Sequence, residues 1–404
     1  MIFTGKVTAA LEEKRTHFRD YQVGLQTQQA QVGAWLAALR QQTVATLAAR
    51  LDESGVAWPG ALPTPEFDQA ADLLLPFGQQ WSSHTDARGW AMTVLKDRPV
   101  AAVDGSQITP TKEYSLPVGA VQVGWFINFH EAEGRYIKDV LFEVLAPGEL
   151  AEEADEAGDS ADGNFPNQEV NQLRFVRECD QLCTIMAGYA HMEERQRPLC
   201  FFDGSFVISF AGQMAPRHAH AYVNAVRQVL ACSARDRAPL VGFVDSSASR
   251  DLVTMLEVLH QQPGALKLTD GALLMSGGVL RNWGDRTPFF RCARDDRLAR
   301  NGLGAFYGDV AFTYIQLAME RPPARLEVPR WIVEEGRADE VVDLVRAECV
   351  VGMGYPYAIE TADALAVISM QDRQRFYALL EQFAQRAGLS FTRARKAASK
   401  RARR

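Results

Sequence analysis

The chain has 404 residues, of which 47% are hydrophobic and 23% charged, a composition typical of a globular protein with one large or two medium domains. Its apolar stretches are all far shorter than the roughly 20 residues of a membrane-spanning helix, and Met1 leads into a polar segment without the pattern of a signal peptide. We therefore expect a cytoplasmic protein without membrane contacts. The six cysteines show no CxxC spacing, which argues against a zinc site or a disulfide framework.

The N-terminal segment has helical periodicity. Apolar residues from Val7 to Leu39 recur at roughly helical spacing among Gln, Arg and Glu residues. Four prolines between Pro59 and Pro76 then break the pattern. We predict that residues 1–95 form a helical arm and a proline-rich connector, and that this arm contacts a partner protein or a second copy of the chain.

Residues 96–370 contain an alternating series of strand and helix patterns. Short apolar runs bounded by turn residues predict strands, and apolar residues at helical spacing predict helices. The predicted elements are, in chain order, a strand ending at Asp104, strands at 118–129 and 136–145, a helix at 168–195, a strand at Leu199, a helix at 219–234, a strand at 240–244 and a helix at 250–260. This order predicts an α/β fold of the ribonuclease H-like type, with a mixed sheet flanked by helices.

Two segments outside these elements carry charge of one sign. Seven acidic residues and no base lie between Glu149 and Asp162, so we expect residues 149–163 to be a disordered insertion within the 96–370 domain. Residues 371–404 are predicted to form a C-terminal helix and a basic tail, whose last twelve residues hold seven bases and no acid. Such a tail either follows nucleic-acid phosphates or serves only solubility, and the sequence leaves both open.

Two Asp-Gly-Ser triplets stand at the ends of predicted strands. The first begins at Asp104 and the second at Asp203. Each alone is most simply a turn, because Asp-Gly is a common hairpin signal. Two copies, each after a buried strand, indicate two carboxylates delivered to one place, with the glycine letting the backbone turn away. This arrangement is typical of a metal site.

Two further acidic residues occupy positions where the ribonuclease H-like plan has metal ligands. That plan takes carboxylates from the first strand, the first helix, the fourth strand and a late helix. Glu178 on the intervening helix and Asp363 on a late helix complete the set that Asp104 and Asp203 begin. Each also has a simpler explanation. Glu178 fits a solvated partner of Arg174 one turn earlier, and Asp363 fits an acid in the first turn of its helix.

The chemistry predicted for these acids is phosphodiester hydrolysis with divalent cations. An all-oxygen set formed by Asp104, Glu178, Asp203 and Asp363 suits Mn²⁺ or Mg²⁺. We expect two ions, roughly 3.5 to 4 Å apart, of which one generates the attacking hydroxide and the other stabilises the departing oxygen.

Candidate substrate contacts flank these acids. Ser106 and Ser205 are predicted to position water or phosphate, and Asp245 and Arg250 follow the strand at 240–244. Arg250 suits a phosphate clamp, although a surface arginine is the commoner case. Asp245, with the two serines after it, also fits a helix N-cap.

Several segments resemble NurA-type nucleases, from about Val100 to about Ser369. They are the two Asp-Gly-Ser triplets, the Asp245-Ser246-Ser247 turn followed by Arg250, the run from Arg325 to Pro329, and Gly354-Tyr355-Pro356-Tyr357. The resemblance implies a Mn²⁺-dependent nuclease with 5′ to 3′ exonuclease and endonuclease action on single- and double-stranded DNA. It also implies a homodimer that works with the hexameric HerA ATPase in the resection and repair of double-strand breaks. Two positions depart from the family: Asp245 stands where Lys is frequent, and Asp363 where His occurs.

Two other functions remain open. A catalytically silent scaffold would dock on a ring ATPase through the helical arm, but the retained carboxylates count against it. An actin-like ATP-binding protein also has Asp-Gly-Ser after strands, yet it needs glycine-rich phosphate loops in two repeated halves, and only Gly277-Gly278 offers a glycine pair. No Walker-type loop is present, so we assign any ATP dependence to a partner.

Overall fold

The computed structural model describes residues 2–70, 72–150, 167–319 and 321–392. Most of the predicted acidic insertion and every base of the predicted C-terminal tail lie outside these residues. The chain divides into two compact units, which differ from the predicted boundaries at residues 95 and 370. The first unit comprises Met1–Gln80, Val244–Arg300 and Ala305–Val333, and the second comprises Trp81–Phe243, Asn301–Gly304 and Glu334–Arg404.

The strands of the second unit lie in the order β6-β5-β2-β3-β4. Their bounds are Val100–Ile108 for β2, Gly119–Asn128 for β3, Tyr136–Leu145 for β4, Leu199–Asp203 for β5 and Leu240–Val244 for β6. β2, β3 and β4 form an antiparallel meander, while β5 runs parallel to β2 and β6 runs parallel to β5. The predicted meander and the mixed α/β architecture are therefore confirmed.

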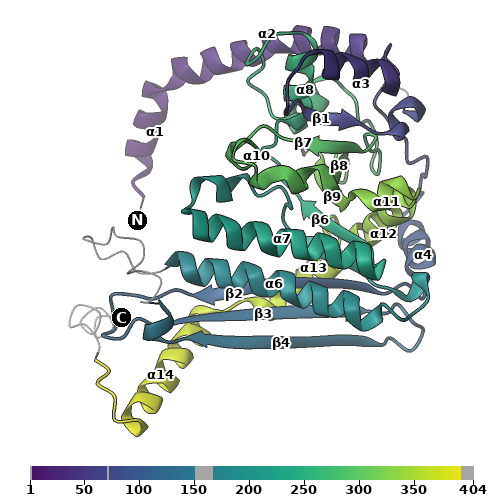
Figure 1. Ribbon diagram of the computed structural model, residues 1–404. Helices are drawn as coiled ribbons and strands as arrows, with labels where there is room; N and C mark the ends of the chain where they lie inside the picture. The colour runs from purple at the N-terminus through teal and green to yellow at the C-terminus, as the bar shows by residue number, and fades with distance from the viewer. Residues whose placement is uncertain (1, 71, 151–166, 320, 393–404) are drawn as a thin grey trace. The chain divides into compact units, whose positions relative to one another are not determined.

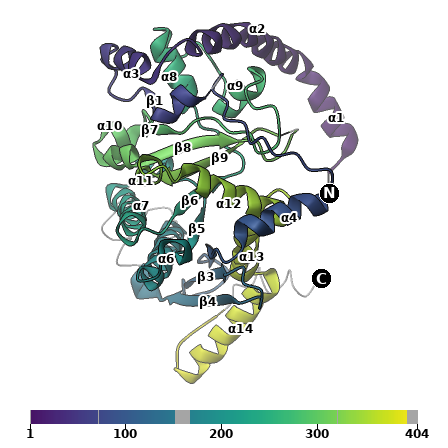
Figure 2. The same cartoon turned by 90° about the vertical axis from the view of Figure 1, so that its right-hand side faces the viewer.

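Helices cover both faces of this sheet (Figures 1 and 2). α6 and α7 pack against each other on one face, and α13 lies on the other. The helices of this unit are α4 His84–Leu95, α6 Asn167–Tyr189, α7 Pro216–Asp236, α12 Ala338–Val351, α13 Tyr357–Ala366 and α14 Met370–Arg386. Within the described parts of the chain, no helix combines the length and the hydropathy needed to cross a bilayer.

β2 continues to Ile108, beyond the strand end predicted at Asp104. Gly105 pairs with Val123 and Ser106 pairs with Gln122, so the first Asp-Gly-Ser triplet lies inside the strand. The prediction that the backbone turns away after Asp104 is therefore wrong. The reason is tertiary, because β3 runs alongside and supplies pairing partners for the whole of β2.

The first unit begins with the predicted helices. These are α1 Thr4–Glu13, α2 Arg15–Leu39 and α3 Val44–Glu53. The connector predicted after them contains a strand, β1 Gly60–Pro63, because these residues find an antiparallel partner in β7 Phe290–Ala293. β8 Val310–Ile315 and β9 Ala324–Pro329 extend the order to β1-β7-β8-β9.

All strand pairs recorded within the first unit are antiparallel, whereas the second unit includes parallel pairs. The two units therefore do not repeat one another, which disfavours the actin-like alternative. The remaining helices of the first unit are α8 Asp251–Leu259, α9 Asp270–Ser276, α10 Arg297–Arg300 and α11 Arg330–Glu334. Short 3-10 helices lie at Pro65–Gln69, Glu194–Gln196, Ser209–Gln213 and Leu303–Asp309.

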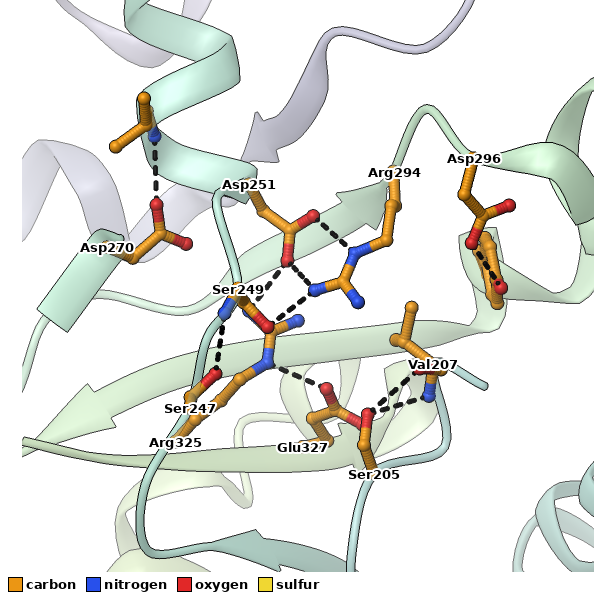
Figure 3. A network of polar contacts seen from close by, with 12 residues as sticks. Ser205, Val207, Ser247, Ser249, Asp251, Asp270, Arg294, Asp296, Arg325 and Glu327 are labelled. Carbon is orange, nitrogen blue, oxygen red and sulfur yellow. Dashed lines mark hydrogen bonds and ion pairs between the residues drawn. The ribbon is translucent and has the colours of Figure 1, made fainter. Parts of the chain in front are cut away.

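A network of charged side chains lies in the core of the first unit (Figure 3). Arg325 on β9 is fully buried, with its Nε 2.7 Å from Glu327 Oε1 and its Nη1 2.7 Å from Asp251 Oδ2. Arg294 donates from Nε to Asp251 Oδ1 at 2.8 Å and from Nη2 to Ser249 Oγ at 2.6 Å. Asp251 and Glu327 thus each have an arginine partner.

Candidate metal centre

Asp203 is the last residue of β5, and its side chain is exposed. The backbone turns away directly after it. Gly204 has a φ of +145°, which residues with a Cβ rarely adopt, and its N–H donates to the carbonyls of Phe202 and Phe243 at 3.0 and 3.1 Å. The turn predicted for this triplet is therefore confirmed. Tyr355 donates its hydroxyl to Asp203 Oδ1 at 2.8 Å.

Asp104 lies in the middle of β2 and is half-buried. The pKa of its carboxyl is raised to about 6, first by burial and against the opposing hydrogen bond of the Gly105 backbone. The charge of Asp203 raises this pKa further, as do a hydrogen bond to Asp363 and the charge of that residue. Asp104 therefore interacts with one carboxylate at the end of β5 and with another on α13.

Asp363 reaches Asp104 because α13 packs directly on β2 and β3. Gly124 on β3 leaves the space for this contact, since a Cβ there would lie 2.9 Å from the backbone N of Ala366. Gln122 Nε2 also donates to the Ala366 carbonyl at 3.1 Å. Asp363 lies beyond the first turn of α13 and is exposed. The explanation of Asp363 as a first-turn acid is therefore wrong.

Glu178 on α6 is only 5% exposed. Its Oε1 accepts a hydrogen bond from Arg174 Nη1 at 2.6 Å. Burial raises the pKa of Glu178 to about 8 despite the opposing charge of Arg174. The charges of Asp104 and Asp203 act in the same direction as burial. The pairing with Arg174 is thus present, but the carboxylate is buried where the simpler explanation required it to be solvated.

These four carboxylates come from β2, α6, β5 and α13 and form one cluster in the second unit. As the side chains stand, no group of three or more His, Cys, Asp or Glu residues in the described chain could hold a metal ion. Protein donors engage two of the acids, since Arg174 binds Glu178 and Tyr355 binds Asp203. Asp203 and Asp363 are exposed, which leaves one side of the cluster open to solvent.

The sequence profile of the NurA domain matches residues 98–368. The chain belongs to the NurA domain family. Among solved structures it is similar to the NurA nuclease from Sulfolobus solfataricus, with 13% identity, a TM-score of 0.45, and coverage of 72% of this chain and 85% of that one. It is also similar to a NurA with manganese, with 9% identity, a TM-score of 0.40, and coverage of 71% and 89% respectively. No curated protein matches the sequence.

Both serines predicted to contact substrate bond to nearby backbone in this NurA-family chain. Ser106 Oγ accepts a hydrogen bond from the N–H of Ile368 at 3.3 Å. Ser205 Oγ accepts one from the N–H of Val207 at 3.0 Å. Each serine directly follows the glycine of its triplet, so both hydroxyls lie close along the chain to a cluster carboxylate.

The other two predicted substrate residues belong to the first unit. Asp245 is exposed, and α8 has Arg250 at its N-cap with no side-chain cap, so the N-cap explanation of Asp245 is not supported. Arg250 donates to the carbonyls of Leu266 and Leu268, each at 2.8 Å. These bonds tie the guanidinium of Arg250 to the backbone of Leu266 and Leu268 in the same unit.

Three residues of the candidate site are not predicted by the sequence analysis. Tyr355 lies in the Gly-Tyr-Pro-Tyr segment that carried the resemblance, and this position was the available signal. Arg174 was noted only as a surface partner of Glu178, one turn away. For Gly105 the sequence predicts a turn. In the structure its missing side chain makes room for Glu178, whose Oε1 would lie 2.4 Å from a Cβ at this position. No local sequence pattern indicates this contact.

Proposed function

We propose that this chain is a metal-dependent DNA nuclease, a phosphodiester hydrolase of the NurA type. The observation that carries the proposal is the cluster of Asp104, Glu178, Asp203 and Asp363, in which negative charge exceeds the positive charge of Arg174. A cluster with only a structural role would match its buried acids with cations, because unbalanced buried charge destabilises a fold. Membership of the NurA domain family supports the same activity.

The donor set fits Mn²⁺ or Mg²⁺, which prefer carboxylate oxygens to Cys and His. We propose that Asp104, Asp203, Glu178 and Asp363 would together hold two such ions. Bound divalent cations supply an activated water and stabilise charge on the leaving oxygen. Their positive charge would also offset the repulsion that helps to raise the pKa values of Asp104 and Glu178.

In this proposal, residues around the cluster orient the metal-binding carboxylates and contact the substrate. Tyr355 fixes Asp203 through its hydroxyl, and its ring packs edge-on against Phe243 with centroids 5.0 Å apart. We propose that Ser106 and Ser205 position water or a phosphate oxygen. Exposed Asp245 is proposed to face the nucleic acid, whereas the bonds of Arg250 to two backbone carbonyls favour a structural role for that residue.

We further propose 5′ to 3′ exonuclease and endonuclease cleavage of single- and double-stranded DNA, in the resection and repair of double-strand breaks in the cytoplasm. This part of the proposal depends on the resemblance to NurA-type nucleases. The strand order β6-β5-β2-β3-β4, in which a meander is followed by two parallel strands, supports a ribonuclease H-like plan for the second unit.

We propose that the chain forms a homodimer and works with a HerA-type hexameric ATPase. Two apolar surfaces support such contacts, since exposed apolar patches and strand edges are common sites of association. On α1, Val7 and Leu11 are 43% and 55% exposed. β4, which ends the strand order, exposes six large apolar residues by 41% to 55%: Tyr136, Ile137, Val140, Leu141, Phe142 and Val144. If β4 forms the dimer contact, a Phe142→Glu protein should have half the wild-type mass by light scattering.

The deciding experiment is digestion of end-labelled single- and double-stranded DNA with Mn²⁺, Mg²⁺ or EDTA. Asp104→Asn and Asp203→Asn each remove one charge and keep the side-chain shape. Asp180→Asn is the matched control, because Asp180 lies on α6 close to Glu178 but pairs with Arg177 on the accessible side of the helix. We expect the wild type and the control to cleave in metal, and the two cluster variants to be inactive with normal thermal melts.

Other outcomes would change the assignment. Cleavage that persists in both cluster variants would place the active site elsewhere. A wild-type protein that cleaves no DNA with any metal, alone or with a HerA-type ATPase, would favour the docking-scaffold function.

A further inference from the structure

Arg174 connects Glu178 to the strand β2. Its Nη1 donates to Glu178 Oε1 at 2.6 Å and to the carbonyl of Gly105 at 3.2 Å. The second carboxylate oxygen, Oε2, accepts no hydrogen bond from the residues that the structure describes. One oxygen of Glu178 is therefore held by Arg174, and the other has no hydrogen bond from the described residues.

Gly105 makes this arrangement possible. A Cβ at this position would lie 2.4 Å from Glu178 Oε1 and 2.8 Å from Arg174 Cγ, so even alanine would displace both side chains. Gly105 does not have a positive φ, so its backbone conformation does not require glycine. Glycine inside a strand weakens the strand and often marks a close approach. Here the close approach is that of Arg174 and Glu178.

The environment of Arg174 is not that of a surface ion pair. Its side chain is 29% exposed and that of Glu178 is 7% exposed. Arg174 Nε is buried without a hydrogen-bond partner, a condition that opposes folding. The side chain thus leaves one donor unsatisfied while its Nη1 bonds both Glu178 and β2.

We propose that Arg174 is a positioning residue of the metal centre, which holds Glu178 Oε1 and thereby presents Oε2 to a divalent cation. This inference rests on the proposed metal-dependent activity. Hydrogen bonds to the far side of a metal ligand fix its orientation, and their loss typically lowers metal affinity roughly 10- to 100-fold. The positive charge of Arg174 also lets Glu178 stay close to Asp104 and Asp203 before a cation arrives.

The test is titration of the full chain with Mn²⁺, followed by calorimetry and by thermal melting. For Arg174→Gln we expect the Kd for Mn²⁺ to rise roughly 10- to 100-fold and the Mn²⁺-induced increase in Tm to shrink. Arg174→Lys keeps the charge and should recover part of the affinity. Arg177→Gln is the matched control, because Arg177 lies on the same helix, is 34% exposed and pairs with Glu143 and Asp180. Its Kd for Mn²⁺ should equal that of the wild type.

Gly105→Ala disturbs the same arrangement from β2 and should also weaken Mn²⁺ binding, so it decides the question if Arg174→Gln does not fold. Unchanged Mn²⁺ affinity in Arg174→Gln would overturn the inference. Tighter binding would overturn it as well, because it would mean that Arg174 competes with the cation. If the wild-type protein binds no Mn²⁺, the proposed function and this inference both fail. If the wild type binds Mn²⁺ and Arg174→Gln binds it equally well, only this inference fails.

Discussion

Among the described residues, two clusters of acids, each with at least one buried carboxylate, differ in how their charges are balanced. In the first unit, burial alone would raise the pKa of Asp251, but Arg294 and Arg325 hold it below its ordinary value. In the second unit, Asp104 and Glu178 have pKa values raised to about 6 and about 8, because burial is reinforced by neighbouring carboxylates. Burial acts to raise the pKa of Asp251 as it does for Asp104 and Glu178, and the supply of arginines differs.

This difference separates a structural cluster from a candidate binding site. Paired buried charges depend on each other and stabilise the fold only while the pairs are intact. A surplus of carboxylates has no such internal partner and is stabilised by a cation from solution. Asp270 marks the limit of the rule. Its pKa is raised to about 6 by burial and by the charge of Asp251. It nevertheless accepts hydrogen bonds from Val253 N and Tyr314 OH, so its role is structural.

The largest expected effect is on catalysis. Asp104→Asn should reduce Mn²⁺-dependent DNA cleavage by about 10³-fold or more, a barrier increase of about 4 kcal/mol. Its metal-free Tm should stay equal or rise, because the substitution removes a charge that is close to Asp203 and Asp363. Cleavage assays and thermal melts in EDTA measure the two quantities. A metal-free Tm several degrees below that of the wild type would mean that Asp104 is mainly structural.

The next effect is on stability and concerns the balanced cluster. Asp251→Asn should lower the free energy of unfolding by about 3–5 kcal/mol, because Arg294 and Arg325 lose their shared buried acid. Urea denaturation measures this change. Asp245→Asn is the control in the same unit, since exposed Asp245 should change stability by no more than about 0.5 kcal/mol. Equal effects of the two substitutions would contradict the comparison.

A third prediction concerns pH. The folded protein keeps protons on Asp104 and Glu178 at pH values where the unfolded chain has released them. Their contribution to stability is therefore present below about pH 4 and lost as the pH rises through about 6 and about 8. In EDTA, the Tm of the wild type should fall relative to that of Glu178→Gln as the pH rises over this range. At the upper end of the range, Mn²⁺ should restore the Tm of the wild type. A pH-independent difference would argue against the raised pKa of Glu178.

The smallest expected effect comes from Tyr355. Tyr355→Phe removes one hydrogen bond to Asp203 and keeps the ring against Phe243. We expect cleavage to fall about tenfold, consistent with the loss of a hydrogen bond to a charged group. The Tm should change by only a few degrees. Complete loss of cleavage with intact Mn²⁺ binding would show that the hydroxyl does more than hold Asp203.

The sequence by itself determined the order of the elements from β2 to β6 and the identity of the clustered acids. β4 and β6 have the predicted bounds 136–145 and 240–244, because strand periodicity and turn residues are local signals. Asp203 was correctly assigned to a strand end, since Gly204 there needs a positive φ. The four acids are candidates because their chemistry and their order along the chain fit the ribonuclease H-like plan, and the fold brings Asp104 close to the other three.

Only the tertiary structure decided how these residues are used. β2 passes beyond Asp104 because β3 pairs along its whole length, and no pattern within β2 states how long its neighbour is. Glu178 is buried because α6 packs closely enough on Gly105 to exclude water, although its helical spacing to Arg174 fits an exposed pair equally well. Local sequence sets the backbone geometry and the available charges. Burial and the matching of charges depend on segments that are distant in the chain, so they appear only when the fold brings those segments together.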